Sequence, residues 1–282
     1  LKAIGWSVAF GVEGLVVGVV VILGLVWLLQ GGVESAWFDQ VGLQQAFVQG
    51  IGLTIGFGVA TYHVGHGILG RSWESLRWRP SGAPGPWLAR GVVLGAATGI
   101  VAMLLGLILA GANWTLGEGT WLEWSRASVT TAAALALPAL SEELIFRGVP
   151  LVLLARLIGR ERAVLATAAV FGLAHLANPD ATGLGIANIT MAGVLLGTVF
   201  YAPGGIWAAW GAHLGWNLSL AAAGAPVSGL PLPIPLVKYL PGSPDWMTGG
   251  AFGPEGGILA TVAMAGAVFI AWRWIPKGAS TA

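Results

Sequence analysis

The sequence contains no cysteine, and this absence excludes several kinds of site. Disulfide bonds, thiolate nucleophiles and cysteine-ligated zinc all require that residue. Charged residues are also scarce, at 9% of the 282 residues, where an ordinary soluble domain has about 25%. The net charge is only +1, and no run of basic residues is long enough to follow a phosphate backbone. The chain is therefore neither a disulfide scaffold nor a nucleic-acid-binding protein.

The chain is instead strongly apolar. Hydrophobic residues make up 56% of it, and the mean hydropathy is +0.81. A helix that spans a bilayer needs roughly 20 apolar residues. Eight runs approach or exceed that length, at residues 5–30, 45–69, 87–112, 127–156, 162–178, 184–202, 204–223 and 256–275. We predict an all-α polytopic membrane protein in which residues 1–282 form a single transmembrane domain of eight helices.

The positions of the positive charges favour this number of helices. Lys and Arg concentrate in the cytoplasmic loops of membrane proteins. With the N-terminus inside, ten of these residues fall in inside segments and only two, Arg126 and Lys238, in outside segments. An odd number of helices would remove this separation. We therefore predict that both termini are cytoplasmic, and the composition suits the inner (plasma) membrane of a bacterium.

One stretch places charge where a membrane helix tolerates little of it. Glu142, Glu143 and Arg147 lie inside the fourth apolar run. A charged side chain near the bilayer centre costs roughly 3 kcal/mol or more, so such residues usually face an interior cavity. On a helix, Glu143 and Arg147 are i,i+4 neighbours that can pair, and Glu142 is rotated by about 100° from Glu143. We predict that Glu143 is held by the arginine and that Glu142 is available for chemistry.

Two later runs carry polar side chains at a similar depth. At a rise of about 1.5 Å per residue, Glu142 lies about 22 Å from the outer end of its run. By the same measure His175 lies about 20 Å from the inner end of its run, and His213 about 14 Å above the turn at Pro203. Asn217 follows His213 by four residues and shares its helix face. We expect the carboxylate, the two imidazoles and the amide to converge near the middle of the membrane.

These four side chains are compatible with two kinds of hydrolytic site. Glu142 can act as a general base on a water that it shares with His175, while His213 and Asn217 donate hydrogen bonds to an oxyanion. Glu142, His175 and His213 can alternatively bind one zinc ion, as one carboxylate and two imidazoles. The residues alone leave open whether the water is activated with or without a metal.

Other polar features have simpler interpretations. His63 and His66 are expected to be satisfied core residues, and Glu13, two turns inside the membrane, is expected to reach the interface or to pair. A transporter or channel with a proton path along these three residues is the alternative. Segment 224–255, rich in Pro and Gly, is a long loop that could serve as a lid or bind a partner, or be an irregular surface loop.

The polar residues form three motifs that occur in a fixed order: Glu142-Glu143-xxx-Arg147, Phe171-xxx-His175 and His213-xxx-Asn217. In these motifs the chain resembles the intramembrane CAAX-protease and bacteriocin-processing (CPBP) family, also called abortive-infection proteins. This family includes type 2 CAAX prenyl proteases. The resemblance covers roughly residues 127–222, about a third of the chain. It implies eight transmembrane helices around a cavity and endoproteolysis of a membrane-bound peptide or protein, in some members a prenylated CAAX peptide.

The resemblance also implies roles for individual residues. Glu142 would activate the water with His175, and His213 and Asn217 would stabilise the oxyanion. The paired glutamate and arginine would hold the helix and orient Glu142. A divalent metal, zinc above all, stays open as a cofactor. Membrane lipid and a membrane protein partner are further expected contacts.

Competing functions are less well supported by the sequence. The motifs HExxH, GxSG and GxGD, which are typical of other intramembrane proteases, do not occur. From a different class, a non-catalytic membrane subunit or chaperone could keep the same scaffold and act by binding a partner. The glycine-rich helix faces and the 224–255 loop are the features that would serve such a function.

Overall fold

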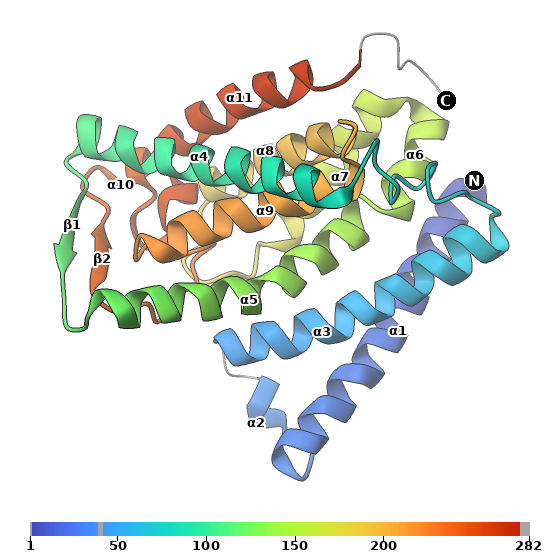
Figure 1. The fold of residues 1–282 in the computed structure, drawn as a ribbon, viewed down its shortest axis with the longest axis horizontal. Coiled ribbons are helices and arrows are strands. Elements are labelled where there is room, and N and C mark those ends of the chain that lie inside the picture. Colours follow the sequence, from blue (N-terminus) through green and yellow to red (C-terminus); the bar gives the residue numbers. More distant parts are fainter. Residues whose placement is uncertain (1, 39–41, 277–282) are drawn as a thin grey trace.

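The computed structural model describes residues 2–38 and 42–276, and helices dominate it (Figure 1). The α-helices are α1 (Lys2–Gln30), α2 (Ser35–Phe38), α3 (Leu43–Ala60), α4 (Pro84–Ala110), α5 (Trp121–Phe146), α6 (Val149–Ile158), α7 (Arg160–Ala174), α8 (Gly183–Phe200), α9 (Gly205–Ala222), α10 (Asp245–Thr248) and α11 (Ile258–Arg273). A π-helix, Thr61–Ile68, continues α3. Strands β1 (Asn113–Leu116) and β2 (Val237–Leu240) pair antiparallel. Two short 3₁₀ turns, Gly250–Phe252 and Pro254–Gly256, precede α11.

Each of the eight predicted apolar runs overlaps an α-helix of the structure, and the run 127–156 overlaps two, α5 and α6. Within the described residues, five helical segments are long and apolar enough to cross a membrane: Lys2–Gln30, Leu43–Ile68, Pro84–Ala110, Trp121–Ile158 and Gly183–Phe200. Helix α11 is also apolar but shorter. The prediction of a helical membrane protein is therefore confirmed at this level.

The prediction of one continuous helix over residues 127–156 is wrong, because the chain breaks between α5 and α6. The amides of Arg147 and Gly148 both donate to the carbonyl of Glu143, which ends the regular α-helical pattern. Pro150 follows in the first turn of α6, where a helix needs no amide hydrogen. The Glu-Glu-xxx-Arg stretch consequently lies at the end of a helix and not in its middle.

Helices α4 and α9 pack with almost no side chain between them. A Cβ atom at Gly95 would lie 1.9 Å from the carbonyl oxygen of Ala212, and one at Gly211 would lie 2.2 Å from that of Leu88. Only glycine permits such close backbone approach. The glycine spacing at Gly91/Gly95 and Gly211/Gly215, a pattern typical of tight helix contacts, thus marks the face on which the two helices meet. This contact fixes the rotation of α9, whose opposite side carries His213 toward the interior.

Helices α1 and α3 form a pair that meets the rest of the protein mainly through contacts of α3 with α5, and α1 also contacts α6 (Figure 1). Within the pair, a Cβ at Gly56 would lie 2.2 Å from the carbonyl oxygen of Gly14. Between the pair and α5, a Cβ at Gly50 would lie 2.4 Å from Cδ of Pro138. Glycine therefore lets α3 approach α5 near the polar residues at the end of α5.

The segment between α9 and α11 is held by specific contacts. Strand β2 pairs with β1, and Tyr239 and Phe252 are buried in the core. Glu255 is only 3% exposed, although it is a charged residue type. Part of this segment therefore lies inside the protein, and an interpretation as an irregular surface loop alone is wrong.

Candidate active site

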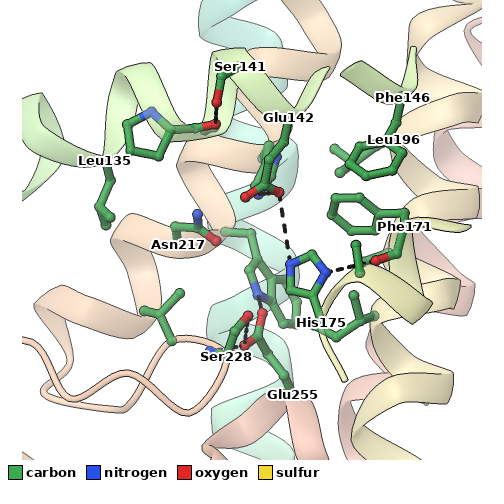
Figure 2. Close-up of a pocket in the computed structure, with 18 of the residues that line it drawn as sticks. Leu135, Ser141, Glu142, Phe146, Phe171, His175, Leu196, Asn217, Ser228 and Glu255 are labelled. Atoms are coloured by element: carbon green, nitrogen blue, oxygen red, sulfur yellow. Dashed lines mark hydrogen bonds and ion pairs between the residues drawn. The ribbon is translucent and has the colours of Figure 1, made fainter. Parts of the chain in front are cut away.

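A cavity of about 440 Å³ lies among α3, α5, α7, α8, α9 and the segment that follows α9. Its ionisable lining residues are Glu142, His175, His213 and Glu255, and Asn217 adds an amide. Figure 2 shows several of these side chains directed into the same space. The structure thus brings together the four residues that the sequence singles out for chemistry, and adds a second carboxyl group.

Glu142 is weakly restrained. Its side chain is 31% exposed, and its Oε2 atom is buried without a hydrogen-bond partner among the described residues. Oε2 lies 3.9 Å from Nε2 of His175 and 3.7 Å from Nε2 of His213. These separations are too long for direct hydrogen bonds but suit a water that bonds to the carboxylate and to an imidazole.

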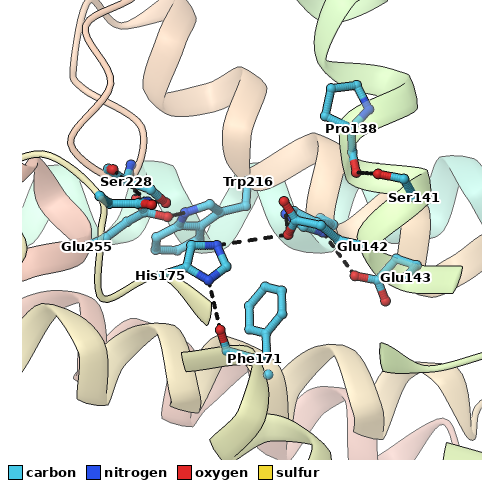
Figure 3. Close-up of polar contacts among 12 residues, drawn as sticks. Pro138, Ser141, Glu142, Glu143, Phe171, His175, Trp216, Ser228 and Glu255 are labelled. Carbon is cyan, nitrogen blue, oxygen red and sulfur yellow. Dashed lines mark hydrogen bonds and ion pairs between the residues drawn. The ribbon is translucent and has the colours of Figure 1, made fainter. Parts of the chain in front are cut away.

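His175 is oriented by the end of α7. The helix stops at Ala174, and Nδ1 of His175 lies 2.8 Å from the carbonyl oxygen of Phe171. Since a carbonyl only accepts, Nδ1 carries the hydrogen and donates it. In the neutral ring Nε2 then has a free lone pair, and this atom faces Glu142 (Figures 2 and 3).

Glu143 has two partners where the sequence predicted one. Its Oε1 atom accepts from Nη1 of Arg147 at 3.1 Å, which confirms the predicted pair. The same oxygen lies 2.9 Å from Nδ1 of His213, on another helix. Glu143 and Arg147 are completely buried, and the guanidinium lies 4.2 Å from the ring centre of Phe171. The sequence analysis missed the contact with His213, which turns Nε2 of that ring toward Glu142.

Asn217 lies one turn after His213 on α9 and lines the same cavity. The glycine face of α9 is occupied by α4, so these two side chains are directed to the other side. Figure 2 places Asn217 near Glu142. Its amide group is therefore on the wall that a bound peptide carbonyl could reach.

A polar cluster at the far end of the cavity was not predicted from the sequence. The carboxyl group of Glu255 accepts from Nε1 of Trp216 at 2.6 Å, from Oγ of Ser228 at 2.8 Å and from the backbone amide of Ser228. Asn178 donates to the carbonyl of Ser228 at 3.0 Å, and Asn188 to that of Glu255 at 2.7 Å. A charged residue just before the last apolar run was the only sequence signal for this cluster.

The segment that carries most of these cavity residues matches a known protein family. Residues 124–219 match the family model described as Rce1-like, type II CAAX prenyl endopeptidase. The expected resemblance is therefore confirmed. The match covers about a third of the chain and includes all three polar motifs. Comparison with curated proteins and comparison with solved structures gave no match.

The structure bears on the predicted zinc ligands without deciding the call. Among the described residues, no group of three His, Cys, Asp or Glu side chains is close enough to form a candidate metal site. In both His175 and His213, however, Nδ1 is bonded to an oxygen and Nε2 faces Glu142, an arrangement that metal-binding histidines share. Zinc bound by Glu142, His175 and His213 therefore stays a prediction, and the chemistry below is derived from the protein groups.

The remaining polar residues lie outside the Rce1-like segment and away from the cavity. Glu13 pairs with Nδ1 of His63, at 2.9 and 3.0 Å to its two oxygens. His66 donates from Nδ1 to the carbonyl of Arg71 at 2.7 Å and stacks on Trp73. Glu13 therefore pairs, as expected, and each histidine has a local structural partner. The expectation of a core position is wrong for His63, because its side chain is 59% exposed.

Proposed function

We propose that this protein is an intramembrane endopeptidase that hydrolyses a peptide bond of a membrane-associated substrate, with a water activated by Glu142. The match to a protease family supports the reaction class. One observation carries the mechanism: the free Oε2 atom of Glu142 faces Nε2 of both His175 and His213 at less than 4 Å. This arrangement can hold the reacting water between a base and an acceptor.

The reaction follows from the placement of these groups. Glu142 takes one proton from the water. The lone pair on Nε2 of His175 accepts a hydrogen bond from the second hydrogen of the water and so fixes the orientation of the water. The water oxygen bonds to the substrate carbonyl carbon, and the carbonyl electrons move to the oxygen. The C–N bond then breaks, and the leaving amine takes the proton from Glu142. Water and peptide are thereby converted to a carboxylic acid and an amine.

The opposite wall of the cavity suits the charge that develops on the carbonyl oxygen. Asn217 can donate from its amide nitrogen, and Nε2 of His213 can donate when the ring carries both protons. The contact between His213 and Glu143 supports this role, since a carboxylate on Nδ1 stabilises the doubly protonated ring. Glu143 and Arg147 act by positioning, through the end of α5 and through His213.

The proposal extends to the membrane arrangement. The eight apolar runs cross the membrane as eight spans, with α5 and α6 together forming one span, and both termini lie in the cytoplasm. The distribution of Lys and Arg supports this orientation. A bacterial inner membrane is the proposed location, and a prenylated CAAX-type peptide is one substrate within the proposed class.

The first test replaces Glu142. Purified Glu142→Gln should lose at least about 100-fold in cleavage rate, the contribution typical of a general base. Its thermal stability should stay unchanged, because the side chain makes no hydrogen bond through Oε2. Glu161→Gln is the matched control, since Glu161 is 81% exposed on α7. Cleavage by Glu142→Gln at the wild-type rate would refute the mechanism.

A further inference from the structure

The two histidines of the site belong to helices that share few direct contacts. His175 follows the end of α7, and His213 lies on α9. Helix α7 packs mainly on α8 and α6, whereas α9 packs mainly on α4 and α5. Both imidazoles nevertheless reach one carboxylate, since Nε2 of each lies less than 4 Å from Oε2 of Glu142. The relative position of the two histidines therefore depends on links other than direct packing of α7 on α9.

A tight turn after α9 takes part in such a link. Val227 and Leu230 exchange two backbone hydrogen bonds, and the residues between them, Ser228 and Gly229, have φ angles of 49° and 81°. Both angles are in the left-handed region, as in a type I′ turn. Val227, Ser228 and Leu230 line the cavity. The 227–230 turn is thus part of the wall of the candidate active site.

The turn is joined to the segment that follows α7. Asn178 donates from its side chain to the carbonyl of Ser228 at 3.0 Å, and from its backbone amide to the carbonyl of His175 at 3.1 Å. A Cβ at Gly229 would lie 2.0 Å from the carbonyl oxygen of Pro179, so the two backbones meet with no side chain between them. The position of the turn and the position of the end of α7 are therefore coupled.

Glu255 joins the same turn to α9. Its carboxyl group accepts from the backbone amide and the hydroxyl of Ser228, the latter at 2.8 Å, and from Nε1 of Trp216 at 2.6 Å. Trp216 lies on α9, next to Asn217 and three residues after His213. Figure 3 shows Glu255 between Trp216 and Ser228. One buried carboxyl group thus completes a chain of hydrogen bonds from α9 to the end of α7.

The backbone around Glu255 is fixed by contacts that do not involve its carboxyl group. Asn188 on α8 donates to the carbonyls of Glu255 and Gly257, at 2.7 and 2.8 Å. The side-chain oxygen of Asn188 in turn accepts from Thr261 on α11. The carboxyl group therefore projects from a restrained base and can hold its partners at a set separation.

We propose that Glu255 is a positioning residue for the proposed hydrolysis, which holds α9 and the segment after α7 at the separation at which the two histidines act on one substrate bond. Its carboxyl oxygens are bonded to Trp216 and Ser228, so it acts through these partners and not by contact with the substrate. This inference rests on the proposed endopeptidase function. Glu255 lies outside residues 124–219, so the feature is not part of the Rce1-like match.

The test uses the purified full chain and a library of farnesylated peptides with three randomised residues after the cysteine. Kinetics are measured on the peptide that the wild type cleaves fastest. Glu255→Gln keeps the size of the side chain, but its amide nitrogen is a donor that must face either the indole N–H of Trp216 or the donors of Ser228, so one connection breaks. We expect kcat to fall at least about tenfold while KM changes less than about twofold, since misplaced groups act on the transition state.

A second variant cuts the link at its other end. Asn178→Leu removes the side-chain bond to Ser228 and should lower kcat by a similar factor. Because the two connections lie in series, the double variant with Glu255→Gln should lose no more than about twofold beyond the larger single effect. Thr167→Val is the matched control. Its buried hydroxyl lies on α7 and bonds to a carbonyl of the same helix, so its loss should leave kcat unchanged.

Hydrogen exchange measured by mass spectrometry tests the link without a substrate. Glu255 reaches the segment 175–181 through Ser228 and Asn178. The amides of this segment should therefore exchange at least about tenfold faster in Glu255→Gln than in the wild type, and at the wild-type rate in Thr167→Val. A purely local role of Glu255 would accelerate exchange around its own partners and leave this segment unchanged.

The outcomes separate this inference from the function on which it rests. In folded Glu255→Gln, an unchanged kcat, an effect confined to KM, or unchanged exchange in the segment 175–181 would overturn the positioning role and leave the endopeptidase standing. Losses that multiply in the double variant would do the same. Where Glu255→Gln does not fold, an unchanged kcat in Asn178→Leu is the overturning result. Full activity of Glu142→Gln, or cleavage of no peptide by the wild type, would refute the proposed function and the positioning role with it, even where the exchange rates show the link.

Discussion

Replacing Glu143 should show separately what its contact with Arg147 contributes to stability and what its contact with His213 contributes to activity. Glu143 and Arg147 are both completely buried, and the carboxylate also bonds to His213. Glu143→Ala leaves the guanidinium without a counter-ion. Its other close neighbours include a carbonyl oxygen of Gly193 at 3.4 Å and the ring of Phe171, neither of which carries a negative charge, and Glu142 attracts it electrostatically without forming an ion pair. Breaking a buried ion pair by removing one partner costs about 3–5 kcal/mol, so we expect a loss of stability in that range.

A double replacement then isolates the contact with His213. Glu143→Leu combined with Arg147→Met removes both charges and restores apolar packing. Replacing a buried pair in this way is often neutral or stabilising, so the unfolding temperature should return to near that of the wild type. Cleavage should stay low, because Nδ1 of His213 has lost its acceptor and the ring is free to turn away from Glu142.

Thermal unfolding in detergent and the initial rate of peptide cleavage measure the two effects on the same preparations. Glu143→Gln is the informative third variant, since its amide oxygen can still accept from His213. We expect it to retain more activity than the double variant despite an unpaired arginine. Recovery of both stability and full activity in the double variant would refute the positioning role of Glu143.

Three further predictions concern packing, pH and metal. Gly95→Leu should destabilise the protein by about 1–3 kcal/mol, because even its Cβ would lie 1.9 Å from a backbone oxygen of α9. Gly85→Leu on the same helix is the control, since a Cβ at Gly85 meets nothing within 4 Å. Equal unfolding temperatures for the two variants would contradict the α4–α9 contact. Burial raises the pKa of Glu255, so the folded state binds its proton more tightly than the unfolded state. The contribution of Glu255 to stability should therefore be complete below the ordinary glutamate pKa and should fall as pH rises toward the raised value, by up to about 1.4 kcal/mol per pH unit. Glu255→Gln should flatten the dependence of the unfolding temperature on pH, and an equally steep dependence in this variant would be the contrary result. Incubation with EDTA followed by its removal should leave the cleavage rate unchanged, and a loss that zinc restores would show instead that a metal activates the water.

Part of this site could be predicted because it follows from helix geometry alone. Neighbouring positions on a helix differ by about 100°, so Glu142 and Glu143 had to face different surroundings. The i,i+4 spacing likewise predicted the pair with Arg147, which the structure confirms. The spacing of Gly211 and Gly215 indicates which side of α9 a neighbouring helix approaches, and in the structure this neighbour is α4. Each of these inferences needs only residues within a few turns of one another.

The remaining features depend on contacts between distant segments. The bond from Glu143 to His213 joins residues 70 apart, and the bond from Glu255 to Trp216 joins residues 39 apart. Neither has a local sequence pattern, because the partners meet only after the helices have packed. The break before α6 was missed for another reason: the apolar run continues through Gly148 and Pro150 without a polar interruption. Hydropathy reports only that a segment is apolar, and it does not show where the helix axis changes direction within that segment.

An experimental structure of the purified protein at a resolution that shows ordered water would test the central claim most directly. The account predicts a water within about 3.2 Å of Oε2 of Glu142 and of Nε2 of His175, with His213 held by Glu143. A Glu142 side chain directed into the lipid would contradict it. So would a metal ion about 2.0–2.2 Å from Glu142 and both imidazoles, since the activating group would then be the metal and not the carboxylate.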